Sequence, residues 1–402
     1  MKSARILFVA MSGSVHTHRW ISQVADGSRD IHLFPSVEAG YLHPGIGNVT
    51  VHNNLFLGQK GTFPCRTFRD TPAHLWPFLL AAKLFWRGLW EVSRRVPRDL
   101  RLKLLIRRIR PDVVHSMEIQ HAGYLVLEAK RRGTGRFPPW IVTNWGSDIY
   151  LFGRLAAHEP RIREVLSECD YYSCECLRDV KLAAEYGFRG VVLPVFPNTG
   201  GFDLEKLSRL KSPGPPSSRR LIVLKGYQHW AGRALVGLRA LERCADLLGN
   251  FEVAIYSAPH EVRIAAELFS KAAGVPVRIV PLESSHDEIL GLHGRARVSI
   301  GLSIGDAIST ALLEAMVMGS FPIQSFTSCA NEWVDDGTTG ILVHPEDPEA
   351  VERALRRALA DDALVDRAAE ENARLASERL ERFHLKSRTV ALYEQVLGGS
   401  RR

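Results

Sequence analysis

The chain has 402 residues, of which 46% are hydrophobic and 24% are charged. This composition excludes a disordered chain, and the length exceeds what one hydrophobic core usually serves, so we expect two globular domains. A formal net charge of +8 and a pI of about 9.3 favour acidic partners such as nucleotides, anionic lipids or nucleic acid.

The apolar runs and the cysteines indicate the cellular compartment in which the protein is expected. No apolar run approaches the roughly 20 residues that a membrane-spanning helix requires, and MKSARILFVAMSG lacks the features of a signal peptide. Six cysteines, at positions 65, 169, 174, 176, 244 and 329, are too few and too irregular for a disulfide scaffold. We therefore expect a cytoplasmic protein with reduced thiols. The run CDYYSCEC, residues 169–176, invites a metal site, but its strand-like alternation favours buried structural cysteines and no metal.

In the first half of the chain, short β-type runs alternate with helical patterns. ARILFVA predicts a strand that ends in the loop MSGS, and a helix follows through Trp20. Further strands are predicted at residues 31–34, 111–117, 140–148, 170–174 and 190–196, with helices at 123–132 and 177–187. This alternation is typical of a mostly parallel, doubly wound sheet.

Between these elements, residues 75–110 form a basic, aromatic stretch. It holds ten Lys and Arg residues against Glu91 and Asp99, interleaved with Trp76, Phe78, Phe85, Trp86 and Trp90. Such a segment suits a membrane interface, with its rings at the headgroups and its arginines on lipid phosphates. Alternatively, it forms ordinary helices that pack an aromatic face on a core, and the sequence leaves both interpretations open.

A stretch rich in Pro, Gly and Ser at residues 197–220 marks the domain boundary, and the alternation restarts after it. Strands are predicted at residues 220–226, 251–257, 277–281, 297–303 and 321–325, with helices at 232–248, 260–274, 286–296 and 310–318 and from 347 onward. We expect an N-terminal domain at 1–198, a C-terminal domain at 199–383 and a helix at about 384–402 that packs back on the first domain. Two such domains place ligands at their strand carboxyl ends, in a cleft that a hinge at Gly200 and Gly201 would close.

The run GDAISTALLEAMVMG suggests a binding site. A helix begins near Ser309 and Thr310 and ends at Gly319, and its amino end suits a diphosphate. Glu314, one turn inside, can accept two hydrogen bonds from a vicinal diol such as a ribose, and Asp306 on the preceding loop can bind a second polyol. The alternative is that Glu314 caps the helix or pairs with an arginine.

These residues resemble the nucleotide-sugar domain of retaining glycosyltransferases of family 4, which have the GT-B fold. The similarity rests on the loop acid that seven residues separate from Glu314, on LEAM and on NEWVDDGTTGILVHPEDPEAVERAL. The runs DVVHSM, WGSD and FPNTGGFD match further landmarks in order. The resemblance implies that Glu314 binds the ribose of a nucleoside diphosphate sugar, next to Ile308, Ser309 and Thr310, and that Asp306, where the family usually has Glu, contacts the sugar.

The resemblance also implies catalysis without a metal cofactor, in which Arg and Lys neutralise the leaving diphosphate. Arg233 and then Lys225 are the expected cations, although their spacing departs from the family's Arg-x4-Lys. In the N-terminal half, Trp145 stands where the family commonly has His, and Asp148 matches the acid that follows. Asp148 could instead cap its turn.

The loop after the first strand offers further contacts to donor or acceptor. Gly13 would allow close approach of a diphosphate or an acceptor. His16, His18 and His115 are candidates for acceptor contact, although a histidine near a strand end is more often satisfied in place.

The expected function is transfer of a hexose from a nucleoside diphosphate sugar to an acceptor hydroxyl with retention. The basic stretch favours a lipid-linked or cell-envelope saccharide acceptor and a peripheral position on the inner face of an anionic membrane. Transfer to a small soluble acceptor and a catalytically silent sugar-nucleotide-binding protein remain alternatives. We expect no nucleic-acid partner, because no recognised RNA or DNA motif accompanies the charge.

Overall fold

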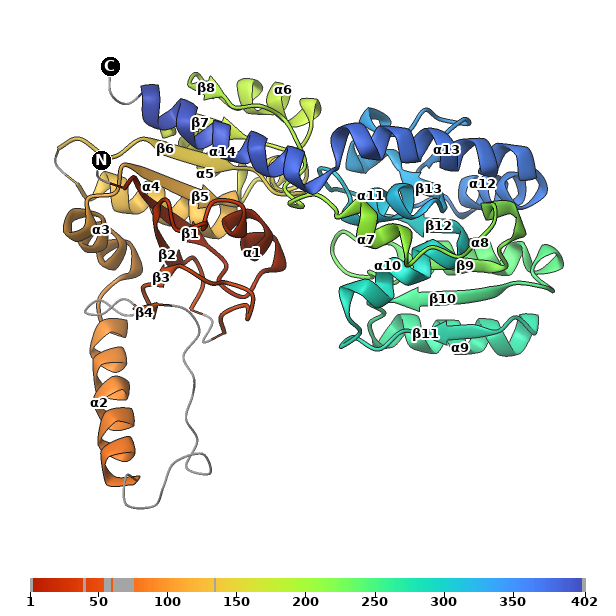
Figure 1. The fold of residues 1–402 in the computed structure, drawn as a ribbon, viewed down its shortest axis with the longest axis horizontal. Helices are drawn as coiled ribbons and strands as arrows, with labels where there is room; N and C mark the ends of the chain where they lie inside the picture. The colour runs from red at the N-terminus through yellow and green to blue at the C-terminus, as the bar shows by residue number, and fades with distance from the viewer. Residues whose placement is uncertain (1–2, 39–40, 54–58, 61–75, 134, 400–402) are drawn as a thin grey trace. The chain divides into compact units, whose positions relative to one another are not determined.

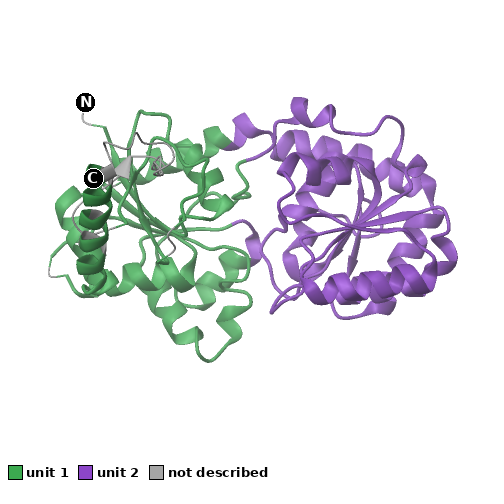
Figure 2. Ribbon diagram, turned by 90° about the horizontal axis from the view of Figure 1, so that it is seen from below, with its two compact units in different colours: residues 1–174, 179–200, 386–402 green, residues 175–178, 201–385 purple. Residues whose placement is uncertain are grey.

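The computed structural model describes residues 3–38, 41–53, 59–60, 76–133 and 135–399 (Figure 1). The chain forms two compact units, coloured separately in Figure 2. Unit 1 comprises Met1–Cys174, Asp179–Gly200 and Lys386–Arg402, and unit 2 comprises Glu175–Arg178 and Gly201–Leu385. Cys65 and Leu75 lie outside the described residues, as do the side chains of Trp76, Trp86 and Trp90.

Unit 1 contains an eight-stranded sheet in the order β4-β3-β2-β1-β5-β6-β7-β8, parallel except for the β3–β4 pair. Its strands are β1 (Arg5–Ala10), β2 (Asp30–Pro35), β3 (Thr50–Val51), β4 (Gln59–Lys60), β5 (Val113–Met117), β6 (Trp140–Thr143), β7 (Tyr171–Ser173) and β8 (Val191–Val192). Its helices are α1 (Val15–Ser22), α2 (Trp76–Arg94), α3 (Arg98–Ile109), α4 (Tyr124–Arg131), α5 (Glu159–Glu168), most of α6 (Leu177–Glu185) and most of α14 (Arg382–Gly399).

The two faces of the β1 strand pack against different helices. Leu7 and Val9 belong to a core with α3, α4 and α5. Phe8, on the opposite face, contacts the ring of Tyr393 from α14. Both faces of the sheet are therefore covered, as a buried parallel sheet requires.

A buried polar network fixes α14 against unit 1. The Trp20 indole donates to the Tyr393 hydroxyl at 2.8 Å, and that hydroxyl lies 2.6 Å from Nδ1 of His115. Nε2 of His115 lies 2.6 Å from Oγ1 of Thr143. Burial lowers the pKa of His115 to about 3, so the ring is neutral. Trp20, Tyr393 and His115 each have an acceptor if Tyr393 donates to Nδ1 and His115 donates from Nε2 to Thr143.

Unit 2 contains a six-stranded parallel sheet in the order β11-β10-β9-β12-β13-β14. Its strands are β9 (Leu221–Lys225), β10 (Glu252–Tyr256), β11 (Val277–Ile279), β12 (Ala296–Gly301), β13 (Phe321–Ser325) and β14 (Ile341–Val343). Its helices are α7 (Leu204–Ser208), α8 (Ala234–Arg243), α9 (His260–Ala273), α10 (His286–Arg295), α11 (Thr310–Met318), α12 (Pro348–Ala360) and α13 (Asp362–Arg379).

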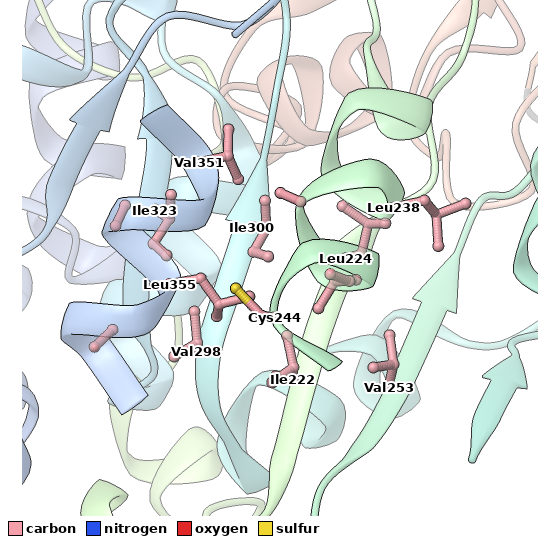
Figure 3. Close-up of a cluster of buried hydrophobic side chains, with 14 of the residues drawn as sticks. Ile222, Leu224, Leu238, Cys244, Val253, Val298, Ile300, Ile323, Val351 and Leu355 are labelled. Carbon is pink, nitrogen blue, oxygen red and sulfur yellow. The ribbon is translucent and has the colours of Figure 1, made fainter. Parts of the chain in front are cut away.

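The core of unit 2 shows why β9 reads as a continuous apolar run. Ile222 and Leu224 pack toward α8, α9 and α12, with Ile300 of β12 beside them (Figure 3). Leu221 and Val223 face the opposite side, in a cluster with residues of α10 and α11. The predicted class, two doubly wound α/β units, is therefore confirmed.

Two glycines stand where the chain passes from unit 1 to unit 2. Gly200 and Gly201 have φ of 78° and 75°, a region that favours glycine. A Cβ on Gly201 would also come within 2.8 Å of the Cα of Arg382. The junction therefore requires glycine for backbone geometry and for packing.

Replacing Tyr393 with Phe should destabilise the protein by about 1–3 kcal/mol, because Trp20 and His115 each lose a buried partner. Urea unfolding at pH 7 measures this difference. Tyr256→Phe is the matched control, because its buried hydroxyl has no hydrogen-bond partner among the described residues. Equal destabilisation by the two substitutions would contradict a structural role for the network.

Candidate functional site

Two loops at the carboxyl edge of the unit 2 sheet are held together. One follows β9 and the other follows β12, the neighbouring strand. Arg233 N–H donates to the Leu302 carbonyl at 3.1 Å, and Ile304 N–H donates to the Ala231 carbonyl at 2.9 Å. Because open α/β sheets bind ligands at this edge, the paired loops are the candidate donor site.

Glu314 lies at this edge, on the fifth position of α11, and is only 5% exposed. Nε2 of His286 lies 2.6 Å from one carboxylate oxygen, and Nε2 of His293 lies 3.9 Å from the other. Burial lowers the pKa of His293 to about 4 despite the opposing effect of Glu314. Both of these partners of Glu314 are imidazoles.

Lys225, at the end of β9, lies within electrostatic range of His293 and His229. Its ammonium lies 4.4 Å from the ring centroid of Tyr227, and its charge depresses the pKa of both His293 and His229. Among the described residues, Lys225 forms no ion pair. It is therefore a cation available to an anionic ligand.

Arg233 is more heavily engaged than Lys225. Its Nε donates to Glu346 at 2.9 Å, and its Nη1 donates to the carbonyls of His229 and Gly232. A diphosphate would have to compete with Glu346 for this guanidinium. The geometry therefore makes Lys225 a more available cation for the diphosphate than Arg233. The sequence predicts the opposite order.

His229 is a site residue that the sequence prediction missed. Burial is the first cause of its lowered pKa, followed by the charges of Lys225 and Arg233, and Asp306 opposes them. The imidazole is thus within electrostatic range of all three predicted charged residues. His229 stands in the same loop as Arg233, and that proximity was the signal available in the sequence.

The loop of Asp306 is anchored from a distant part of the sequence. Arg178 donates from Nη2 to the Asp306 carbonyl at 2.7 Å and from Nη1 to the Thr327 carbonyl at 3.0 Å. The Asp306 carboxylate accepts the N–H of Ala307 at 3.0 Å. Arg178 belongs to the four-residue segment of unit 2 that precedes β9 by more than 40 positions, so no local pattern pointed to it.

The amino end of α11 has the predicted form. Ser309 is the N-cap residue but makes no side-chain cap hydrogen bond, and it is buried, as is Ile308. Thr310 is partly exposed at the first helical position. Contacts from Ile308 and Ser309 to a ligand would therefore be made chiefly through the backbone, where a helix start offers N–H groups.

One group among the described residues could offer three metal-ligand atoms. Cys176, Cys329 and Glu332 place these atoms within 4.8 Å of one another, and the two sulfurs are 2.9 Å apart. The Glu332 carboxylate, however, accepts the N–H groups of Leu177 and Arg178. Glu332 thereby caps the start of α6 and holds Arg178 in place.

In unit 1, the loop after β1 brings two predicted residues together. The rings of His16 and Trp145 lie 5.7 Å apart. The Trp145 indole N–H is buried and has no hydrogen-bond partner among the described residues. His18 instead stacks on His43 at 4.6 Å, and burial followed by His43 lowers its pKa. The His16–Trp145 pair is the better candidate for sugar contact, since an unpaired indole N–H can donate to a hydroxyl.

Gly13 does not leave open space for a ligand in this structure. A Cβ at Gly13 would come within 2.8 Å of the Tyr41 ring. The Ser12 hydroxyl also donates to the Tyr41 carbonyl at 2.8 Å. A diphosphate that approached Gly13 would therefore have to displace the Tyr41 side chain, which is 59% exposed.

His115 also needs correction. It is fully buried between Tyr393 and Thr143, so it cannot contact an acceptor here. It is a satisfied core histidine.

Asp148 stabilises the turn after β6 through hydrogen bonds from backbone N–H groups. One carboxylate oxygen accepts the N–H of Trp145 at 2.8 Å and that of Ile119 at 3.0 Å. Burial and then the charge of Glu118 raise its pKa well above the usual range. Glu118 is itself buried and accepts the N–H groups of His121 and Ala122 in the π-helical turn Ile119–Gly123. Asp148 therefore positions Trp145 through this hydrogen bond.

Two family models match the chain. "Glycosyl transferases group 1" matches residues 267–375, which include Asp306 and Glu314, and "Glycosyl transferase 4-like" matches residues 93–173, which include Trp145 and Asp148. Together with the structural matches below, these two regions support a GT4-like glycosyltransferase. No curated protein sequence matches it.

Solved structures confirm the GT-B fold of the glycosyltransferase. Sucrose-phosphate synthase from Thermosynechococcus elongatus has a TM-score of 0.69 at 14% identity, over 98% of this chain and 100% of its own. HepE of Anabaena in complex with UDP-glucose has a TM-score of 0.67 at 12% identity, over 97% and 99%. A trehalose-6-phosphate structure from E. coli, bound with UDP-2-fluoro glucose, has a TM-score of 0.66 at 14% identity, over 98% and 99%. At these identities the likeness shows the shared fold.

Substitutions at Asp148 separate a positioning role from a catalytic one. Asp148→Asn keeps an oxygen for the two N–H donors, so transfer activity should stay within about threefold of wild type. Asp148→Ala leaves both donors unpaired and should destabilise the protein by about 1–3 kcal/mol. Activity assays and urea unfolding of both variants measure these effects. A large loss of activity in a stable Asp148→Asn variant would show that the carboxylate acts directly.

Proposed function

We propose that the glycosyltransferase moves a hexose from a nucleoside diphosphate sugar to an acceptor hydroxyl, with retention and without a metal. The observation that carries the proposal is the buried carboxylate of Glu314 at the carboxyl edge of the unit 2 sheet, on the helix whose amino end follows the Asp306 loop. A carboxylate with two acceptor oxygens fits a ribose diol, and the helix start beside it fits a diphosphate.

Donor binding would change the partners of Glu314. His286 occupies one of its oxygens at 2.6 Å and is 41% exposed, so it stands on the solvent side of the carboxylate. A ribose would take over or share that oxygen, and the ring of His286 would have to move. The UDP-glucose and UDP-2-fluoro glucose named with two similar structures make uridine nucleotides the first donors to test.

The chemical step requires stabilisation of the leaving diphosphate. As the bond from the anomeric carbon to the phosphate oxygen breaks, negative charge grows on that oxygen, and Lys225, Arg233 and the start of α11 would stabilise it. The acceptor oxygen attacks from the same face, and the departing phosphate takes its proton. Asp306 would hold a sugar hydroxyl, and no protein nucleophile is needed.

For the acceptor, we favour a lipid-linked or cell-envelope saccharide, with the enzyme peripheral on the inner face of the membrane. The basic composition of α2 and α3 supports this choice. A small soluble acceptor is the second candidate, favoured by the similar sucrose-phosphate synthase. A silent sugar-nucleotide-binding protein is the third, because Asp306 and Trp145 depart from the family pattern.

Glu314→Ala should abolish nucleotide-dependent stabilisation. Wild-type protein screened against UDP, GDP, ADP, CMP and dTDP and their sugar conjugates should melt at a higher temperature with one nucleotide family. The stabilisation is about 2.7 kcal/mol when the ligand is at one hundred times its Kd. Differential scanning fluorimetry measures the shift.

Glu378→Ala, an exposed glutamate of α13 paired with Arg374, is the matched control and should keep the shift. If the wild type melts cooperatively and no nucleotide shifts it, the proposed donor site is wrong. A shift retained by Glu314→Ala would place the nucleotide elsewhere.

Lys225→Met should lower kcat by about a hundredfold, because it removes one charge from the developing phosphate. Arg233→Gln should have a smaller effect, because Arg233 is shared with Glu346. EDTA should leave the wild-type rate unchanged, and NMR of the product should show the anomeric configuration of the donor. An inverted product or loss of activity in EDTA would refute the retaining, metal-independent mechanism.

A further inference from the structure

The helix α2 exposes an apolar stripe. Phe78, Phe85 and Val92 are 73%, 61% and 51% exposed, and their spacing of seven residues, about two helical turns, places them on one side of the helix. Leu80 and Leu84 are also at least half exposed, but helical spacing places them on the other side of the helix, near Lys83 and Arg87. In Figure 1, α2 projects away from the sheet of unit 1.

The neighbouring helix α3 behaves differently. Leu102, Leu105, Ile106 and Ile109 are buried in the core of unit 1. The interpretation as an ordinary packed helix therefore holds for α3, whereas the apolar side chains of α2 named above are at least half exposed. Contiguous apolar surface of this kind usually marks an interaction site.

The charges of α2 indicate the partner. Lys83, Arg87 and Arg94 follow helical spacing on the side away from Phe78 and Phe85, and Glu91 is the one acid in the helix sequence. A helix with an apolar side and a basic side suits the boundary between lipid headgroups and acyl chains. A protein partner would not require this accompanying positive charge.

An arginine group stands where α2 leads into α3. Arg94 and Arg98 each lie 3.6 Å from the carboxylate of Glu38, and Arg101 hydrogen-bonds to it. Among the described residues, the Glu38 carboxylate is thus paired with three guanidinium groups, of which those of Arg94 and Arg98 are the more exposed. Guanidinium groups bind phosphate well, so this group fits a phosphate of an anionic lipid.

The arginine group also adjoins a polar cavity of unit 1. Arg98 lines a cavity of about 460 Å³ together with Ser36, His121 and Tyr124. His121 follows β5 and Ser36 follows β2, so the cavity opens toward the carboxyl ends of these strands. A phosphate held at Arg98 would thus lie beside polar groups able to bind a saccharide.

We propose that α2 is an in-plane anchor on an anionic bilayer, with Phe78, Phe85 and Val92 inserted at the acyl boundary and the arginine group on lipid phosphates. None of the described helices has the length and apolarity needed to cross a bilayer. The inference deepens the proposed function by naming the surface on which the acceptor is met. The anchor itself does not require that proposal to be correct.

Flotation of the full-length protein with vesicles tests the anchor. Wild type should float with phosphatidylcholine vesicles that contain phosphatidylglycerol, should float at least tenfold less with pure phosphatidylcholine, and should be released by high salt. The double variant Phe78→Ser and Phe85→Ser should lose at least tenfold in vesicle binding. Leu268→Ser, which changes a 63% exposed leucine of α9, is the matched control and should bind as wild type does.

Three results would overturn the anchor: wild type that does not bind anionic vesicles, a double variant that binds them undiminished, and a dimer in sedimentation that the double variant abolishes while vesicle binding is absent. The last would show an interface between copies of the chain.

Inorganic phosphate at millimolar concentration tests whether the arginine group binds a lipid phosphate or any free phosphate. Release of the protein from vesicles by free phosphate, at constant ionic strength, would show that the arginine group does not require a lipid. The nucleotide-dependent melting shift reports separately on the proposed function and should be unchanged in the double variant.

Discussion

The carboxylate of Glu314, buried against His286, His293 and Tyr256, is the constraint around which unit 2 is organised. A buried carboxylate is expensive unless its charge is balanced or its oxygens are hydrogen-bonded. Burial and the nearby charge of Glu314 raise the pKa of Tyr256, and burial lowers that of His293, so both stay neutral. His286 lies 2.6 Å from one carboxylate oxygen and is the more exposed of the two histidines. In the proposed function, a ribose diol would therefore compete with His286 for that oxygen.

Much of the fold follows from patterns that the sequence displays directly. Strand β9 is apolar at every position from Leu221 to Leu224 because both of its faces are covered, and a run of this kind predicts a central parallel strand. The start of α12 was equally predictable from the sequence, because Asp347 caps the helix and Pro348 occupies its first position. These signals are local, since each depends on neighbours within a few residues.

The site was only partly predictable, and the misses have a common physical cause. His286 and Glu314 meet across 28 residues, and Arg178 reaches Asp306 across 128. No periodicity encodes such contacts. His115 and Asp148 also stand at strand ends, where ligands bind, but His115 is fully buried and Asp148 accepts two local backbone N–H groups. The sequence was sufficient to predict which residues lie at the carboxyl edge of the sheet. Which of these side chains are available to a ligand depends on side-chain packing, which the sequence does not display.

The contact of Tyr393 with Trp20 and His115 has a consequence for biosynthesis. Unit 1 is built from three separate stretches, and its final helix supplies a hydroxyl that two buried groups of the first stretch, Trp20 and His115, need. While the ribosome is still making residues 386–402, the first 200 residues lack this partner. Unit 2 needs only four residues from outside its continuous stretch and is complete earlier. The half of the enzyme that is translated first is therefore the half that finishes folding last.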